Sequence, residues 1–137
     1  TTARGNIVLC LQPELAPKSV NNFVTLARNK FYDGLTFHRV VPDFVIQGGD
    51  PQGTGSGGPG YKFADEPVRQ QYVDGAVAMA NSGPNTNGSQ FFIDIADDTA
   101  KLQPLYNLFG KVQTGLDVAK QIQKGDVMTT VVVREQQ

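Results

Sequence analysis

Residues 79–93 read Met-Ala-Asn-Ser-Gly-Pro-Asn-Thr-Asn-Gly-Ser-Gln-Phe-Phe-Ile, and residues 37–50 read Phe-His-Arg-Val-Val-Pro-Asp-Phe-Val-Ile-Gln-Gly-Gly-Asp. Both blocks alternate turn-forming glycine, proline and asparagine with short β-branched and aromatic runs, a pattern typical of short strands joined by turns. They carry an arginine, two glutamines and several aromatic residues, but no nucleophile beside a base and no metal-binding cluster. These residue types are typical of a site that binds and polarises a peptide without bonding to it.

Outward from these blocks, the spacing of apolar residues predicts many short strands and two separated helices. Pro17 suits a first helical turn, and the stripe that follows it has the spacing of an amphipathic helix over 17–29. Thr114-Gly-Leu-Asp117 resembles a capping box that opens a second helix, which ends at Gly125. Strands are predicted over 6–11, 36–41, 44–47, 76–80, 90–95, 108–112 and 127–134. This element order predicts a mainly β domain, a closed antiparallel barrel whose open ends are plugged by the helices.

Composition limits the class of protein. The chain has 137 residues, of which 39% are hydrophobic and 18% charged, so we expect one globular domain over residues 1–137. The net charge of -1, without a basic stripe, argues against a nucleic-acid partner. No apolar run approaches the roughly 18 residues of a membrane span. Cys10 is the only cysteine, so no internal disulfide can form.

The first residue is Thr1 rather than methionine, which indicates that something upstream was processed or trimmed. The sequence does not fix the compartment. A cytoplasmic location is favoured, with an extracytoplasmic one as the alternative.

Three motifs carry competing interpretations. Gly53–Gly58 matches the dinucleotide fingerprint G-x-G-x-x-G, but Pro59 and Gly60 follow where that motif requires a helix. His38, the only histidine, is interpreted as buried and neutral, with a catalytic base as the alternative. The acidic residues at and after the end of the 90–95 strand lack the spacing of a cation loop and are expected to be solvated; they are Asp94, Asp97 and Asp98.

The 90–95 strand predicts a pocket. Alternation places Phe91, Ile93 and Ile95 on the core face, so that Gln90, Phe92 and Asp94 share the outward face. An exposed aromatic residue beside a glutamine often marks a binding site. In the 44–47 strand the same alternation turns Val45 and Gln47 outward. These residues predict an apolar pocket ringed by glutamine amides; the alternative is that Phe92 belongs to the core at a strand edge.

Such a pocket suits rotation about a prolyl peptide bond. The resonance barrier is about 18–20 kcal/mol, and X-Pro bonds interconvert over tens of seconds although cis and trans are nearly balanced. Rotation removes the conjugation of the prolyl nitrogen. A donor directed at that nitrogen stabilises the twisted state more than either planar state, and a permanently charged arginine suits this task. No nucleophile, metal or cofactor is required.

The residues resemble the cyclophilin family of peptidyl-prolyl cis-trans isomerases over nearly the whole chain. Besides the two opening blocks, the resemblance covers Ala16-Pro-Lys18 with Asn22-Phe23, Phe31-Tyr-Asp-Gly34, Gly53-Thr-Gly55, Phe63-Asp65-Glu66 and Phe109-Gly110-Lys111. It implies an eight-stranded antiparallel barrel with a helix over each end. It also implies an enzyme that assists protein folding by isomerising X-Pro bonds.

The resemblance also implies roles for individual residues. Arg39 would be the catalytic arginine, acting with Gln47 and Phe92. The proline pocket would be lined by Phe44, Val45, Phe92 and Leu102, and the peptide backbone would be bound by Gln47, Ala80, Asn81 and Gln90. At the pocket rim, three positions depart from the common pattern. Val45 stands for the usual methionine, Lys101 for tryptophan and Tyr106 for histidine. The lysine predicts weakened binding of cyclosporin.

The leading hypothesis is therefore an active prolyl isomerase, expected to be monomeric, whose partners are proline-containing peptides and unfolded proteins. A non-catalytic peptide-binding module on the same barrel is the alternative. It would have no need for Arg39.

Overall fold

The computed structural model describes residues 1–135, in which six strands and two helices are formed. In chain order they are β1 (Val8–Leu11), α1 (Pro17–Arg28), β2 (Arg39–Val41), β3 (Val45–Gly48), β4 (Ala76–Met79), β5 (Phe91–Asp94), β6 (Leu108–Thr114) and α2 (Leu116–Gln121). Each falls within or close to its predicted range, so the mainly β class and the positions of both helices are confirmed.

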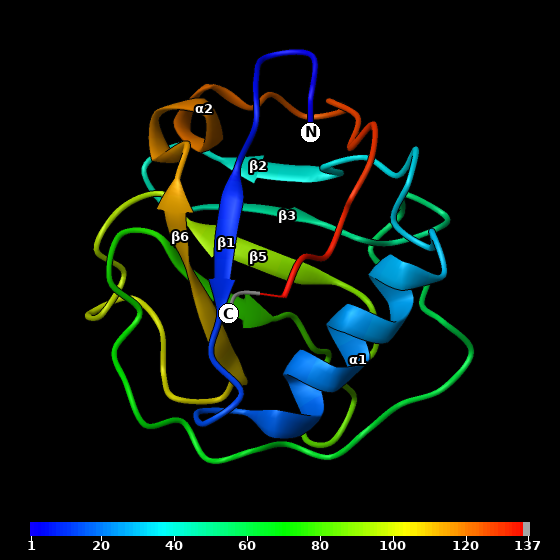
Figure 1. Cartoon of the computed structure of the whole chain (residues 1–137). Coiled ribbons are helices and arrows are strands. Elements are labelled where there is room, and N and C mark those ends of the chain that lie inside the picture. The colour runs from blue at the N-terminus through cyan, green and yellow to red at the C-terminus, as the bar shows by residue number, and fades with distance from the viewer. Residues whose placement is uncertain (136–137) are drawn as a thin grey trace.

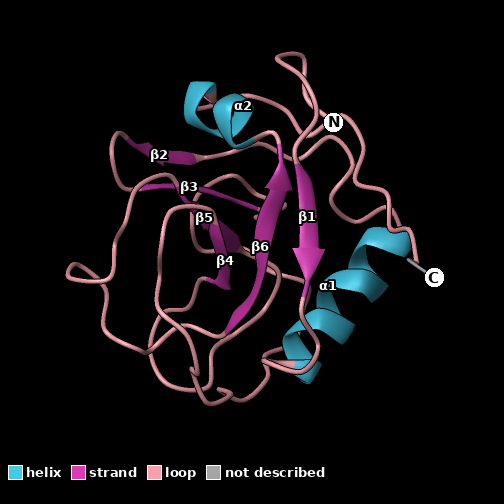
Figure 2. Cartoon of the chain, turned by 60° about the vertical axis from the view of Figure 1, so that its left-hand side comes forward, coloured by secondary structure: helices cyan, strands magenta, loops and turns pink. Residues whose placement is uncertain are grey.

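The strands form one antiparallel sheet in the order β1-β6-β4-β5-β3-β2. The sheet curls strongly, so that β1 and β6 run across the direction of β2 and β3 (Figure 1). The two helices lie at opposite ends of this curled sheet, as a second view also shows (Figure 2). The predicted arrangement of a β structure with a helix at each end is thus observed.

The prediction of a closed eight-stranded barrel is wrong for the part of the chain that the structure describes. The sheet has six strands and stays open between β1 and β2. The expected strand over 127–134 does not form a ladder, because its backbone donors go to unrelated partners. The Met128 N–H donates to the Leu35 carbonyl, that of Thr129 to the Thr1 carbonyl, and that of Val131 to the Asp33 carboxylate. Only an isolated bridge joins Val127 to Thr36.

Both faces of the central strands β3, β4 and β5 are buried. The larger cluster joins the helices to the inner face and includes Phe23, Phe91, Ile93 and Phe109. A smaller cluster covers the other face; it comprises Leu15, Val45, Tyr72, Ala76, Ala78, Phe92 and Leu108. The Phe92 side chain, expected on the outward face, is therefore largely buried, because Leu15 and Tyr72 belong to the same cluster.

The second helix begins differently from the prediction. Its N-cap is Gly115, whose φ of 88° lies in the left-handed region, and no side chain caps the helix. A side chain at this position would also place its Cβ 2.2 Å from the Asn6 carbonyl oxygen. Close packing against the chain entering β1 therefore requires glycine here, and the proposed Thr114–Asp117 capping box does not form.

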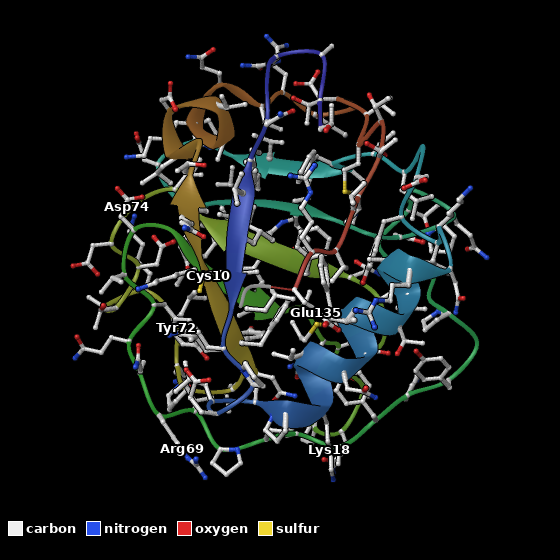
Figure 3. The ribbon with its side chains drawn as sticks, in the orientation of Figure 1. Cys10, Lys18, Arg69, Tyr72, Asp74 and Glu135 are labelled. Atoms are coloured by element: carbon white, nitrogen blue, oxygen red, sulfur yellow. The ribbon has the colours of Figure 1, made fainter. Side chains whose placement is uncertain are left out.

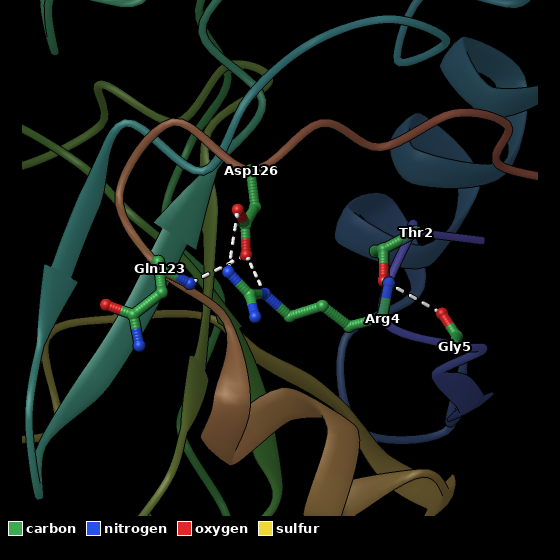
Figure 4. Close-up of polar contacts among 5 residues, drawn as sticks. All are labelled: Thr2, Arg4, Gly5, Gln123 and Asp126. Atoms are coloured by element: carbon green, nitrogen blue, oxygen red, sulfur yellow. Dashed lines mark hydrogen bonds and ion pairs between the residues drawn. The ribbon is translucent and has the colours of Figure 1, made fainter.

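The N-terminal segment is fastened to the chain that follows α2. A tight turn joins Thr2 and Gly5, and the Arg4 side chain reaches the carboxylate of Asp126, with its Nε 2.5 Å from Oδ2 (Figure 4). The same carboxylate accepts the backbone N–H of Gln123. Neither of the described helices has the length and apolar character needed to cross a membrane.

The prediction for the acidic residues at the end of β5 and in the turn that follows is also wrong. Asp94 and Asp98 were expected to be solvated, yet both side chains are 0% exposed. The segment turns back under Tyr72, whose carbonyl accepts the Asp98 N–H at 2.9 Å, and this turn brings the two carboxyl groups together. Burial raises the pKa of both groups, and for Asp94 the adjacent Asp98 raises it further. Because the pKa of Asp94 is raised to about 10, this carboxyl group is protonated at neutral pH.

The proton that Asp94 retains predicts how the free energy of unfolding depends on pH. Above the ordinary Asp pKa of 3.8, the unfolded chain has lost the proton that folded Asp94 keeps. The free energy of unfolding should then fall as pH rises toward the raised pKa, by at most about 1.4 kcal/mol per pH unit. Asp94→Asn keeps a neutral polar side chain of similar size at this position and removes its titration. Urea unfolding between about pH 5 and 9 should show the variant gaining stability over wild type with increasing pH.

Asp97→Asn is the matched control. Its carboxylate is exposed, and hydrogen bonds from Thr99 lower its pKa, so its contribution should be constant over this range. A constant difference in the free energy of unfolding between Asp94→Asn and wild type would contradict a retained proton on Asp94.

Candidate active site

The register of β2, β3 and β5 brings the residues of the site together. Arg39 of β2 lies opposite Gln47 of β3, and Gln47 lies opposite Phe92 of β5. Directly paired residues project from the same face of a sheet. An arginine, a glutamine and a phenylalanine from distant parts of the chain therefore stand side by side in one row.

Hydrogen bonds fix the polar half of this row. The Nη1 atom of Arg39 donates to Oε1 of Gln47 at 3.2 Å, and Nε2 of Gln47 donates to Oε1 of Gln90 at 3.1 Å. The Gln90 amide in turn donates to the carbonyls of Gly55 and Gly57, at 3.0 and 2.9 Å. The side chain of Gln90 is thus engaged on both sides within the protein. Its position makes it a support for Gln47.

A pocket of about 170 Å³ opens beside this row. Its lining contains every predicted site residue except Gln90 and Lys101: Arg39, Phe44, Val45, Gln47, Ala80, Asn81, Phe92, Leu102 and Tyr106. Apolar side chains and the Arg39–Gln47 pair thus face one small cavity. A cavity of this kind can hold a compact apolar ring with a charged donor beside it.

The floor of the pocket belongs to the second core cluster. Phe92 is only 4% exposed and packs edge-to-face on Tyr106, with ring centroids 5.5 Å apart. Both interpretations of Phe92 therefore hold in part, because it belongs to the core and also lines the pocket. Tyr72 supports this floor: its hydroxyl donates to the Tyr106 carbonyl at 2.6 Å and accepts the Tyr106 N–H.

No sequence pattern pointed to Tyr72 (labelled in Figure 3). Along the chain it lies between β3 and β4, in a segment without strand or helix periodicity.

Two cations flank the outer wall of the pocket. The guanidinium carbon of Arg39 lies 6.0 Å from the Phe44 ring centroid, and Nζ of Lys101 lies 5.8 Å from it. The Lys101 ammonium also donates to the Asp43 carbonyl at 3.0 Å. Lys101 therefore stands at the rim behind Phe44 and does not line the cavity. The Asn81 side chain, by contrast, lines the cavity while its amide holds the Leu105 carbonyl at 2.9 Å.

His38 lies outside the pocket. Both ring nitrogens are buried without a hydrogen-bond partner, and burial lowers the pKa of the imidazole, so it is neutral at pH 7. Within residues 1–135, no three acidic, histidine or cysteine side chains gather as metal ligands. A larger hollow of about 310 Å³ lies between α1 and Tyr61–Phe63, but its lining lacks a comparable row of donors above an apolar floor.

The arrangement offers directed N–H donors next to an apolar cavity. Arginine has five N–H donors, of which one contacts Gln47, and its remaining donors are available to a ligand. The pocket lining includes neither a nucleophile paired with a base nor an acid–base pair. Its chemistry is therefore that of binding and electrostatic stabilisation.

Comparison with known proteins agrees with this chemistry. The sequence model of the family described as cyclophilin type peptidyl-prolyl cis-trans isomerase matches residues 1–136. The chain is 52% identical over 126 residues to peptidyl-prolyl cis-trans isomerase ppi1 of Schizosaccharomyces pombe, covering 88% of this chain and 81% of the relative. It is 51% identical over 123 residues to peptidyl-prolyl cis-trans isomerase B of Bacillus subtilis, covering 88% and 85%.

The fold agrees as well. A crystal structure of a cyclophilin type peptidyl-prolyl cis-trans isomerase from Cryptosporidium parvum, determined in the presence of the dipeptide Ala-Pro, matches with a TM-score of 0.89. The match covers 98% of this chain and 96% of that chain at 32% identity. Sequence and fold together place this chain in the cyclophilin family, and it is a peptidyl-prolyl cis-trans isomerase.

Proposed function

We propose that the pocket binds the proline ring of an X-Pro substrate and that Arg39 catalyses rotation of the preceding peptide bond. The observation that supports this assignment is the cross-strand row. It sets the Arg39 guanidinium at the edge of a cavity floored by Phe92. Bound in the cavity, the ring would be fixed while the rest of the peptide turns around it.

The arginine would act on the nitrogen of the rotating bond. As the bond twists, the nitrogen loses conjugation and gains a lone pair that accepts a hydrogen bond. A donor that meets this lone pair only in the twisted state lowers the barrier without tightening ground-state binding. An acceleration of about 10⁵ requires roughly 7 kcal/mol of such differential stabilisation. The Gln47 oxygen restrains one amino group of Arg39 and so orients the others.

The substrate class follows from the openness of the site. Arg39 is exposed, and the pocket is small, so it suits one proline ring in an accessible segment of chain. The Cryptosporidium relative was crystallised in the presence of Ala-Pro. We therefore propose exposed X-Pro segments of peptides and unfolded proteins as substrates. A binding-only module would need the pocket but not the oriented guanidinium.

Arg39→Ala tests the catalytic role. Loss of one directed donor should lower kcat by about 10²–10³ with little change in the unfolding temperature, since the side chain is exposed. Arg39→Lys should recover little of this loss, because an ammonium lacks the planar fork that Gln47 orients. A coupled isomerisation assay on a short X-Pro peptide measures both.

Arg28→Ala is the matched control, as it removes another exposed arginine that is hydrogen-bonded to an acceptor, here Glu135. It should retain full activity. If Arg39→Ala stayed within a factor of about two of wild type, the assignment would be wrong.

Lys101→Trp tests whether the residue at this position of the pocket rim limits the binding of cyclosporin. A hydrated ammonium offers only its alkyl stem for packing, whereas an indole adds apolar area and an N–H donor. We expect Lys101→Trp to bind cyclosporin more tightly than wild type by about 5- to 150-fold, with substrate turnover little changed. Inhibitor titration of both proteins measures the difference.

Lys111→Trp, on the exposed side of β6, controls for the added indole and should leave cyclosporin affinity at the wild-type value. Equal and tight inhibition of wild type and Lys101→Trp would show that this rim position contributes little.

A further inference from the structure

The glycine-rich loop after β3 encloses a carboxylate of its own chain. Asp50 is 1% exposed, and its side chain accepts the backbone N–H groups of Gln52, Thr54 and Gly55, at 2.8, 2.9 and 2.6 Å. Successive N–H groups that converge in this way form a concave anion site, which in nucleotide-binding proteins holds phosphate. Here Asp50 fills the site. The dinucleotide-like spacing of Gly53–Gly58 is thus explained without an external ligand.

The electrostatics of this carboxylate agree with its geometry. Burial by itself would raise the pKa of Asp50, but hydrogen bonds from the surrounding backbone N–H groups outweigh it and hold the pKa below its ordinary value. The loop therefore closes around a permanent negative charge at neutral pH.

Gly57 completes the enclosure. A Cβ added there would lie 1.9 Å from Oδ1 of Asp50, whereas a Cβ on the neighbouring Gly58 would meet nothing within 4 Å. Neither glycine has a positive φ, so alanine suits the backbone at both positions. The close approach of Asp50 is the main reason why position 57 needs a glycine.

The enclosed loop faces the active site through its carbonyl groups. The carbonyls of Gly55 and Gly57 accept both hydrogen bonds that Nε2 of Gln90 donates. This fixes the Gln90 amide so that its oxygen accepts Gln47 Nε2, and Gln47 in turn presents its oxygen to Arg39. A continuous hydrogen-bonded path thus runs from the Asp50 carboxylate to the Arg39 guanidinium.

We propose that Asp50 is a positioning residue for isomerisation: by holding the 52–57 loop closed, it orients Arg39 through Gln90 and Gln47. This proposal rests on the catalytic role proposed for Arg39. Displacing the loop carbonyls would free the Gln90 amide to turn. Gln47 and Arg39 would then lose their fixed orientation while the proline pocket stays intact. Misplacement of a catalytic group by about 1 Å can cost up to about 10² in rate.

The test compares the kcat of Asp50→Ala, of alanine variants at two adjacent glycines, and of one double variant. Asp50→Ala and Gly57→Ala should each lower kcat about 10-fold, whereas Gly58→Ala should stay within about two-fold of wild type. In the Arg39→Ala background, Asp50→Ala should lower kcat by less than a further factor of about two, because a residue that acts through Arg39 loses its effect once Arg39 is absent. Thermal unfolding of each variant reports whether it is folded at the assay temperature. If Asp50→Ala does not fold, the comparison of Gly57→Ala with Gly58→Ala decides.

Each outcome has a distinct meaning. Full activity in folded Asp50→Ala and Gly57→Ala, with Arg39→Ala inactive, would overturn the positioning role and leave the function of Arg39 standing. If Asp50→Ala still lowered kcat about 10-fold in the Arg39→Ala background, the positioning role would also be overturned, since the loop would then act on the substrate directly. Full activity of Arg39→Ala itself would instead refute the catalytic assignment.

Discussion

The structure depends above all on the antiparallel register of β2, β3 and β5. One residue of slip between β3 and either neighbour would turn Gln47 to the opposite face and separate it from Arg39 and Phe92. The register is held because alternate residues of β3 and β5 pack into two different clusters. Ile46 and Ile93 belong to the inner cluster, whereas Val45 and Phe92 belong to the outer one. Burial on both faces thus fixes the geometry that the site uses.

Polar groups inside this framework are paired where they orient the site. The amides of Gln47 and Gln90 are restrained within the protein, and the Asp50 carboxylate accepts several backbone N–H groups. Under the catalytic role proposed for Arg39, such restraint matters because the rate gain would come from donors that need no reorganisation as the bond twists. The exposed guanidinium of Arg39 is therefore backed by a sheet and a loop that hold its partners in place.

The buried Asp94–Asp98 pair has a different relation to the site. Asp94 lies opposite Val45 in the β3–β5 ladder, and Asp98 opens the turn that carries Lys101 and Leu102 to the pocket rim. Protonation of Asp94 lowers the negative charge of the pair, and the Lys101 ammonium lies 3.8 Å from Oδ1 of Asp98. The rim is thus fastened to the sheet by groups that burial alone would disfavour.

The family, the mainly β class and most of the pocket lining could be predicted from the order of residues alone. These predictions depend on local patterns, which can be recognised in the sequence alone. The patterns are the alternation along the strands, the apolar stripe after Pro17 and the two long motif blocks. The prediction of a closed barrel was wrong because strand formation at 127–134 depends on a pairing partner. The backbone N–H groups that a ladder would need donate instead to the Asp33 carboxylate and the Thr1 carbonyl. The burial of Asp94 and Asp98, the support from Tyr72 and the enclosure of Asp50 were likewise decided by tertiary structure. Each of these features requires either a contact between segments that are distant in the chain or a turn that folds back on itself. Both bury polar groups away from water, and no local pattern of residues predicts such burial.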